Sequence, residues 1–216
     1  MAAIIFDMDG VLSDTQTLHA SVEAELFAER GVTISPEAIT ERYAGVADAE
    51  VFRAVMGSSL DAQTLEGLIR EKWVRMMERA PGAVRPMEGA VELVRALAAR
   101  DVPLAVASSS PLGFIDHVLD VLEIAGCFPV RASADEVPRG KPAPDVFLLA
   151  ARRLAVEPRH CTVIEDAVAG MQAAARAGMR CIALVADPAR PVPAAVRVTT
   201  LRELLDRPEL LQLPTA

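Results

Sequence analysis

Two aspartates, Asp7 and Asp9, stand one residue apart directly after a short apolar segment, residues 4–6, and are followed at once by Gly10. Two carboxylates about 4 Å apart repel each other by roughly 1–4 kcal/mol at effective dielectric constants of about 80 to 20. A chain tolerates such a pair where a cation or a reaction uses it. Because the backbone N–H groups around a glycine are open to an anion, the pattern predicts a Mg²⁺ ion and a phosphate group here.

More polar residues follow later strand-like segments or precede helix-like ones. They are Ser108-Ser109-Ser110, Lys141 and Glu165-Asp166. Ligands of open parallel sheets bind beyond the carboxyl ends of the strands, so these groups are expected to meet Asp7 and Asp9. The carboxylates at such an edge would need a hard cation such as Mg²⁺. The serines suit a phosphate, and Lys141 adds a compact positive charge.

The elements that must position these residues alternate between strand and helix. Strands are expected at 4–6, 103–107, 129–132, 161–164 and, as the last one, 180–184; helices are expected at 90–98, 111–124, 144–154 and up to 178. This repetition indicates an α/β fold, a Rossmann-like parallel sheet with helices on both faces.

Residues 15–80 read as helical instead. Leu18, Val22 and Leu26 recur every four residues, as on one face of a helix. Ser35 and Asp61 are expected helix N-caps. Lys72 falls on the apolar stripe of the last of these helices, and the chain is expected to break at Pro81-Gly82 and Pro86. The predicted organisation is therefore a core domain, residues 1–14 and 84–216, interrupted by an inserted all-helical cap domain, residues 15–83.

Composition narrows the function classes. The 216 residues carry a net charge of −8 and a sequence pI near 5.0, which argues against a nucleic-acid or anionic-membrane surface. No segment is long and apolar enough for a membrane span, and the N-terminus does not resemble a secretory signal. Cys127, Cys161 and Cys181 are expected to be buried thiols, so a reducing, cytoplasmic location is expected. The oligomeric state stays open, with a monomer plausible.

The motifs Asp7-Met8-Asp9-Gly10-Val11, Ser108, Lys141 and Glu165-Asp166 occur in an order and spacing that resemble the haloacid dehalogenase-like hydrolases. The resemblance covers essentially the whole chain and is closest to the branch of sugar-phosphate phosphatases and beta-phosphoglucomutase, which has a helical cap. Four separate motifs in order make it specific. It implies an enzyme, a phosphoric monoester hydrolase that uses Mg²⁺ and acts on a small phosphorylated molecule.

The resemblance also implies roles for individual residues. Asp7 would attack phosphorus and form an aspartyl-phosphate, while Asp9 would protonate the leaving oxygen and then deprotonate water. Ser108 and Lys141 would hold the phosphoryl group and offset its charge. The backbone of Met8, Asp9 and Ser109 would add phosphate contacts, and Gly10 would also belong to the phosphate-binding residues. The metal ligands would be Asp7, Asp9 through its carbonyl, Asp166 and Glu165.

An acid at Asp9 suits a leaving group that needs a proton, such as a sugar alkoxide. Phosphatase and mutase activity both remain open. Asp14-Thr15 followed by His19 is similar to the hinge of the mutases, and His19 is placed to steer Asp9 or contact substrate. Asp48, a candidate for the substrate face of the cap, falls where the mutases have an arginine for the second phosphate, which favours a phosphatase.

Several of these residues have plainer explanations. Ser108 could simply cap a helix, and Glu165 could be only a neighbour of the metal ligand Asp166. His19 could be an ordinary residue of a cap helix. Phosphonate-cleaving relatives use a cap lysine, but Lys72 is expected on its apolar stripe, away from such a motif. A non-catalytic protein that binds ligands in an inherited pocket is the alternative outside the enzymes.

Overall fold

A parallel sheet forms the centre of the molecule. The computed structural model describes residues 2–58, 60–187, 189 and 191–213. Within them, six strands form one sheet in the order β3-β2-β1-β4-β5-β6. The strands are β1 Ala3–Phe6, β2 Leu104–Ser108, β3 Val130–Ser133, β4 Cys161–Glu165, β5 Arg180–Leu184 and β6 Val196–Val198. The expected α/β fold is confirmed.

The central position of β1 explains why the functional residues gather. Phe6, the last residue of β1, pairs with Val106 of β2 on one side and with Ile164 of β4 on the other. Beyond these pairs β2 runs on to Ser108 and β4 to Glu165, so the residues at the ends of the three strands emerge at one edge. All residues of β1, β2 and β4 are buried, as expected for strands covered on both faces.

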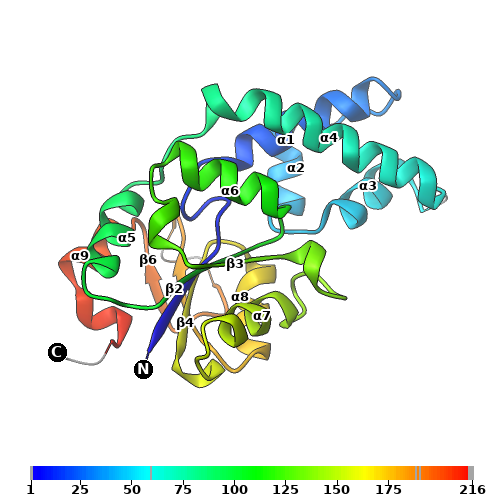
Figure 1. Cartoon of the computed structure of the whole chain (residues 1–216). Helices are drawn as coiled ribbons and strands as arrows, with labels where there is room; N and C mark the ends of the chain where they lie inside the picture. Colours follow the sequence, from blue (N-terminus) through cyan, green and yellow to red (C-terminus); the bar gives the residue numbers. More distant parts are fainter. Residues whose placement is uncertain (1, 59, 188, 190, 214–216) are drawn as a thin grey trace.

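Helices cover both faces of the sheet (Figure 1). Ile4 and Phe6 share one apolar core with helices α5 (Ala90–Ala98), α6 (Leu112–Val121) and α9 (Arg202–Asp206). Ile5, which points to the other face, belongs to a second core with α7 (Asp145–Arg153) and α8 (Val168–Arg176). Short 3₁₀ turns lie at Ala125–Cys127, Ala134–Glu136, Pro158–His160 and Pro208–Leu211.

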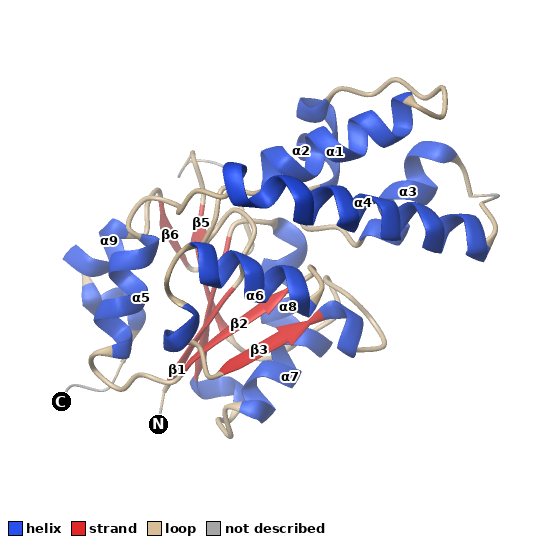
Figure 2. Cartoon of the chain, turned by 45° about the horizontal axis from the view of Figure 1, so that its top comes forward, coloured by secondary structure: helices blue, strands red, loops and turns tan. Residues whose placement is uncertain are grey.

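Within the described residues, four helices between β1 and α5 form a separate block beside the sheet (Figure 2). They are α1 Gln16–Ala28, α2 Pro36–Tyr43, α3 Asp48–Met56 and α4 Ala62–Ala83. Ser35 and Asp61 cap α2 and α4 as expected, accepting hydrogen bonds from the N–H groups of Ala38 and Thr64. The two chain segments that join the block to the sheet run side by side, since the N–H of Asp14 donates to the carbonyl of Arg85 at 2.8 Å.

Three expectations about the fold need correction. The break expected at Pro81-Gly82 and Pro86 begins only after Ala83, because Pro81 lies in the last turn of α4, where the missing N–H costs one hydrogen bond of a long helix. The strand at 180–184 is not the last, because β6 follows; three residues on an edge are too few to show alternation. Cys161 and Cys181 are buried free thiols, but Cys127, in a 3₁₀ turn, is only partly buried.

The structure also bears on membrane association. No helix within the described residues combines the length and the apolar character that crossing a bilayer requires.

Candidate active site

The loop after β1 presents Asp7 and folds back tightly on itself. The carbonyl of Met8 accepts hydrogen bonds from the N–H groups of Val11, Leu12 and Ser13, which turns the chain. Gly10 has a φ of +86°, and a Cβ there would collide with the side chain of Asp166. Glycine is therefore required at this position by both conformation and space.

Lys141 lies between two carboxylates. Its ammonium donates to Asp7, and to Oε1 of Glu165 at 2.8 Å, and all three side chains are at least nine-tenths buried. The other oxygen of Glu165 accepts a hydrogen bond from the N–H of Ala167 at 2.7 Å. Burial tends to lower the pKa of Lys141, but attraction to the two carboxylates outweighs it and raises this pKa above its usual value. The lysine is therefore a fixed positive charge.

Burial has the opposite consequence for Asp7. Desolvation raises the pKa of Asp7 from 3.8 to about 7, although Lys141 acts against this rise, and repulsion from Glu165 and Asp9 adds to it. Without a further cation, the ionised form of this carboxylate is thus unfavourable in the folded protein.

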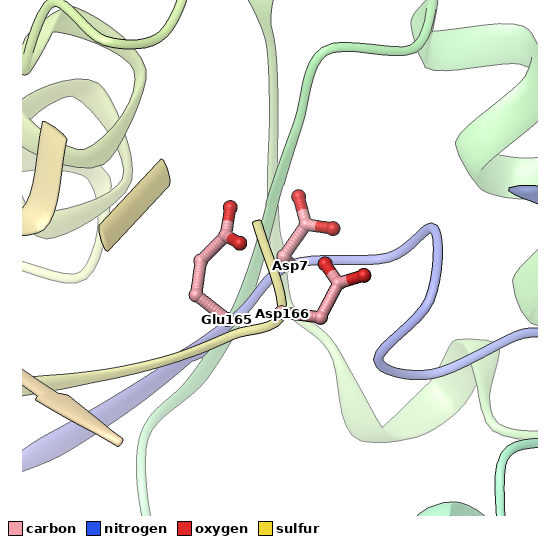
Figure 3. A group of neighbouring side chains, drawn as sticks. All are labelled: Asp7, Glu165 and Asp166. Atoms are coloured by element: carbon pink, nitrogen blue, oxygen red, sulfur yellow. The ribbon is translucent and has the colours of Figure 1, made fainter. Parts of the chain in front are cut away.

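Asp7, Glu165 and Asp166 form a group that fits a metal ion. Each offers a carboxylate oxygen, and these three atoms lie within 4.8 Å of one another (Figure 3). Oδ1 of Asp166 is buried and has no hydrogen-bond partner among the described residues. Burial, together with repulsion from Glu165 and Asp7, raises the pKa of Asp166 well above its usual value. A hard divalent cation would offset the repulsion between the carboxylates and give Oδ1 of Asp166 a partner, so this set of oxygen ligands suits Mg²⁺.

Asp9 has a different environment. Its carboxylate accepts hydrogen bonds from the hydroxyls of Thr15 and Ser110, the latter at 2.7 Å, and lies 3.3 Å from Nε2 of His19. Burial opposes ionisation, but His19, whose Nε2 lies 3.3 Å away, and the two hydroxyls together hold the pKa of Asp9 well below its usual range. The surroundings of Asp9 therefore favour its ionised form, while those of Asp7, two residues away, oppose ionisation.

The serine cluster lies against Asp9. The buried hydroxyl of Ser108, the last residue of β2, lies 3.2 Å from Oδ2 of Asp9 and accepts a hydrogen bond from the N–H of Ser110 at 3.0 Å. The N-cap of the following helix α6 is Pro111 rather than Ser108. The N–H groups of Met8, Asp9 and Ser109 have no acceptor among the described residues, so they are open to an anion.

One cavity connects this edge of the sheet with the helical block. From the sheet side it is lined by Asp7, Asp9, Ser108, Ser109, Ser110, Lys141, Glu165 and Asp166; from the helical side its polar and aromatic lining includes Gln16, His19, Glu23, Thr40, Tyr43, Asp48, Lys72 and Trp73. The expected convergence of the strand-end residues is thus present in the structure. His19 also contacts the edge of Trp73 and of Phe114, at centroid distances of 5.3 and 5.8 Å.

Two residues of the helical block, Lys72 and Asp48, meet at the cavity. Lys72 is buried on its stripe as expected, but its ammonium reaches the cavity and donates to Glu23 and Asp48. Asp48, the candidate for the substrate face of the cap, lines the cavity and lies at this lysine. Lys72 had no expected role at the site, although its being one of two lysines beside twenty arginines was an available signal.

Sequence reasoning also missed residues around the two aspartates. Gln16 donates to Oδ2 of Asp166 and lies 3.4 Å from the carbonyl oxygen of Asp9. Thr15 and Ser110 were seen in the sequence, but neither was assigned to Asp9. Short polar side chains of this kind carry no spacing signal of their own, because they are common in every loop.

Comparison with known proteins identifies the family. A family model described as haloacid dehalogenase-like hydrolase matches residues 1–178. The chain belongs to the haloacid dehalogenase-like hydrolases. Among the relatives of this hydrolase, 6-phosphogluconate phosphatase of Escherichia coli is 31% identical over 96% of the chain and 93% of the relative. Hexitol phosphatase B of the same species is 32% identical over 94% of the chain and 93% of the relative.

The solved structures agree with this assignment. Beta-phosphoglucomutase from Clostridium difficile superposes on this haloacid dehalogenase-like hydrolase with a TM-score of 0.83 and 25% identity, over 98% of this chain and 96% of the mutase. The expected branch, that of sugar-phosphate phosphatases and beta-phosphoglucomutase, is confirmed. The phosphatases among the relatives place the chain in the class of phosphoric monoester hydrolases.

Proposed function

We propose that this chain is a Mg²⁺-dependent phosphatase that hydrolyses a small phosphomonoester, a sugar phosphate, through an aspartyl-phosphate at Asp7. The observation that carries the proposal is the asymmetry between two neighbouring carboxylates in one cavity. Asp7 is held by Lys141 beside a metal-binding group, whereas Asp9 is held by hydroxyls and His19. One carboxylate is thus placed as nucleophile and the other as acid and base.

In the first step, an oxygen of Asp7 forms a bond to phosphorus while the bond between phosphorus and the sugar oxygen breaks. Asp9 gives its proton to that leaving oxygen. Because the resting carboxylate of Asp9 is ionised, it must first take up a proton, and the negative charge of the bound phosphate favours this. Lys141, Ser108 and the free N–H groups of Met8, Asp9 and Ser109, with Gly10 shaping the loop, hold the phosphoryl oxygens.

In the second step, water attacks the phosphorus of the aspartyl-phosphate, and Asp9 accepts the proton of that water. The bond between phosphorus and Asp7 breaks, phosphate leaves and the Asp7 carboxylate is restored. The low pKa of Asp9 suits this half of the reaction, because the residue enters it as a carboxylate.

The proposed metal ligands are Asp7, Asp166 and the carbonyl oxygen of Asp9. Bound there, Mg²⁺ would neutralise charge on the phosphoryl oxygens. Glu165 belongs to the same acidic group, but both of its oxygens already accept hydrogen bonds, from Lys141 and from the N–H of Ala167. We therefore assign Glu165 to positioning Lys141 and to the charge of the metal site rather than to direct metal contact.

The proposal includes the two-domain organisation: a core of residues 1–14 and 84–216 and a cap of residues 15–83. Supporting it, α1–α4 carry one half of the cavity lining and the sheet edge the other. The two connecting segments pair through a bridge between Ser13 and Pro86, so both can bend together when the cap moves. Buried free thiols at Cys161 and Cys181 support a cytoplasmic location.

A mutase is the second candidate, because beta-phosphoglucomutase superposes on the chain and His19 lies beside Asp9. A mutase must also grip a second phosphate. Asp48 stands at the cap position concerned, and the cap lysine next to it is already held by two carboxylates. The phosphatase is therefore favoured.

The test is release of phosphate by the purified protein from a panel of hexose, pentose and hexitol phosphates, with Mg²⁺ and with EDTA. We expect turnover with Mg²⁺ only. Absence of phosphate release from every member of the panel would reject the proposal. Conversion of a hexose 1-phosphate into its 6-phosphate, dependent on added hexose bisphosphate, would instead establish the mutase.

A further inference from the structure

The cap half of the cavity holds a cluster that the proposed reaction does not use. Lys72 on α4 donates to Glu23 on α1 and to Asp48 on α3, and the exposed fractions of the three side chains are 1%, 6% and 18%. All three residues line the same cavity as Asp7 and Asp9. Burying three charges costs free energy even when they are paired, so this arrangement invites a functional explanation.

The cluster carries a net charge of −1, from two carboxylates and one ammonium. Burial tends to lower the pKa of Lys72, but Asp48 and Glu23 outweigh this and raise it, so the lysine stays charged. It cannot act as an amine nucleophile in that state. Its charge is moreover fully committed to the two carboxylates.

The rest of the described lining offers no substitute cation at this end. Its basic residues besides His19 are Lys72 and Lys141, and Lys141 is committed to Asp7 and Glu165. A substrate whose far end carries a carboxylate or a second phosphate would therefore place that anion beside a negative cluster. Carboxylate oxygens are, by contrast, good acceptors for hydroxyl groups, and Thr40 and Tyr43 add hydroxyls to the same lining.

We propose that Glu23, Lys72 and Asp48 are the specificity site for the part of the substrate that is not transferred, and that they select a neutral, hydroxyl-rich end over an anionic one. This inference rests on the proposed phosphatase function and narrows its substrate class to phosphates of polyols or neutral sugars. In this arrangement the two carboxylates accept hydrogen bonds from hydroxyls, while Lys72 keeps the carboxylates in place and limits their repulsion.

The experiment uses two substrates that differ at one carbon. Glucitol 6-phosphate has a hydroxymethyl group at the end far from the phosphate, and 6-phosphogluconate has a carboxylate there. We measure kcat and KM for both with the wild-type protein in Mg²⁺. We expect kcat/KM to be at least about tenfold higher for glucitol 6-phosphate, the size of a like-charge repulsion across several ångströms at an effective dielectric constant of about 20–40.

Asp48→Asn removes one of the two negative charges and leaves Lys72 paired with Glu23. We expect KM for 6-phosphogluconate to be lower in this variant than in the wild type. The ratio of kcat/KM for glucitol 6-phosphate to kcat/KM for 6-phosphogluconate should fall by about tenfold. Glu23→Gln makes the same change from α1 and serves if Asp48→Asn does not fold. The matched control is Glu50→Gln, because Glu50 lies in the same first turn of α3 but is exposed and outside the cavity lining. The control is expected to keep the wild-type preference.

Equal kcat/KM values for the two substrates in the wild-type protein would overturn the inference while leaving the phosphatase intact. If both charge-removing variants fold and lower kcat/KM for the two substrates by the same factor, the cluster has only a structural role. That result would also overturn the inference. The proposed function fails separately, by absence of phosphate release from any phosphomonoester.

Discussion

The first prediction concerns the decrease in the free energy of unfolding that results from burying the carboxylate of Asp7. Burial raises the pKa of Asp7 from 3.8 to about 7, even with Lys141 bonded to the carboxylate. Below pH 4 this aspartate is protonated in the folded and unfolded chain alike and has no effect on stability. Between pH 4 and 7 the folded protein keeps a proton that the unfolded chain has lost, so the free energy of unfolding falls as pH rises. Above pH 7 the full cost is present.

The size of this stability cost follows from the difference between the pKa values of Asp7 in the folded and the unfolded chain. A change from 3.8 to about 7, at 1.36 kcal/mol per unit, corresponds to about 4 kcal/mol. Asn is a neutral side chain of nearly the same shape, so Asp7→Asn should remove this cost. In EDTA at pH 8 we expect the variant to be more stable than the wild type by up to about 4 kcal/mol, or roughly 8–16 °C in Tm for a chain of this length. Its phosphatase activity should be lost, because Asn cannot attack phosphorus.

The assay is urea unfolding in EDTA at pH 8 and at pH 5, with the midpoint and the slope m compared at each pH. The advantage of Asp7→Asn should be large at pH 8 and much smaller at pH 5, and Mg²⁺ should reduce it at pH 8, because the cation stabilises the ionised wild-type carboxylate. Asp120→Asn removes an exposed aspartate and should change stability by less than about 0.5 kcal/mol. An Asp7→Asn protein that folds but is no more stable than the wild type at pH 8 would refute the reasoning.

Three further predictions concern other parts of the site. Lys141→Met leaves Asp7 and Glu165 buried without their shared cation, so we expect a loss of about 3–5 kcal/mol of stability in EDTA at pH 8, with loss of turnover; unchanged urea midpoints would contradict it. Asp9→Asn removes the acid of the first step and the base of the second, so turnover should fall about 10²–10⁴-fold; full activity would exclude this role. Trp73, the single tryptophan, lies 5.2 Å from Phe114 across the boundary between α4 and α6, so its fluorescence should change when Mg²⁺ and beryllium fluoride are added together, and an unchanged spectrum would argue against cap movement.

The phosphate end of the cavity was predictable from sequence for a simple reason. Asp7, Ser108 and Glu165-Asp166 each lie at or directly after the end of a strand, and neighbouring parallel strands end at one edge. Finding the strands was therefore enough to bring these residues together. Lys141 was expected there only from its place before the helix at 144–154, because it lies in a loop whose path no periodicity describes.

The cap end was not predictable in the same way. Helical periodicity placed Lys72 on a buried stripe, and burial is what the structure shows. Periodicity says nothing about which helix packs on the stripe, so it could not bring Glu23 of α1 and Asp48 of α3 to the ammonium. A lysine also separates its apolar stem from its charged end, so the stem can satisfy the stripe while the charge serves a cavity.

The two buried lysines divide the cavity into ends of different chemistry. Each is shared by two carboxylates, so neither has charge to spare in the structure as it stands. At the Asp7 end, a divalent cation would add two positive charges and leave Lys141 free to interact with a phosphoryl group. Among the described residues, the group of three side chains that could hold a metal ion is Asp7, Glu165 and Asp166, so the cap cluster has less reason to recruit a metal. Anion binding is thereby confined to the end where the reaction takes place. A substrate with one phosphate and a neutral tail fits that division in one orientation only, with its phosphate at Asp7.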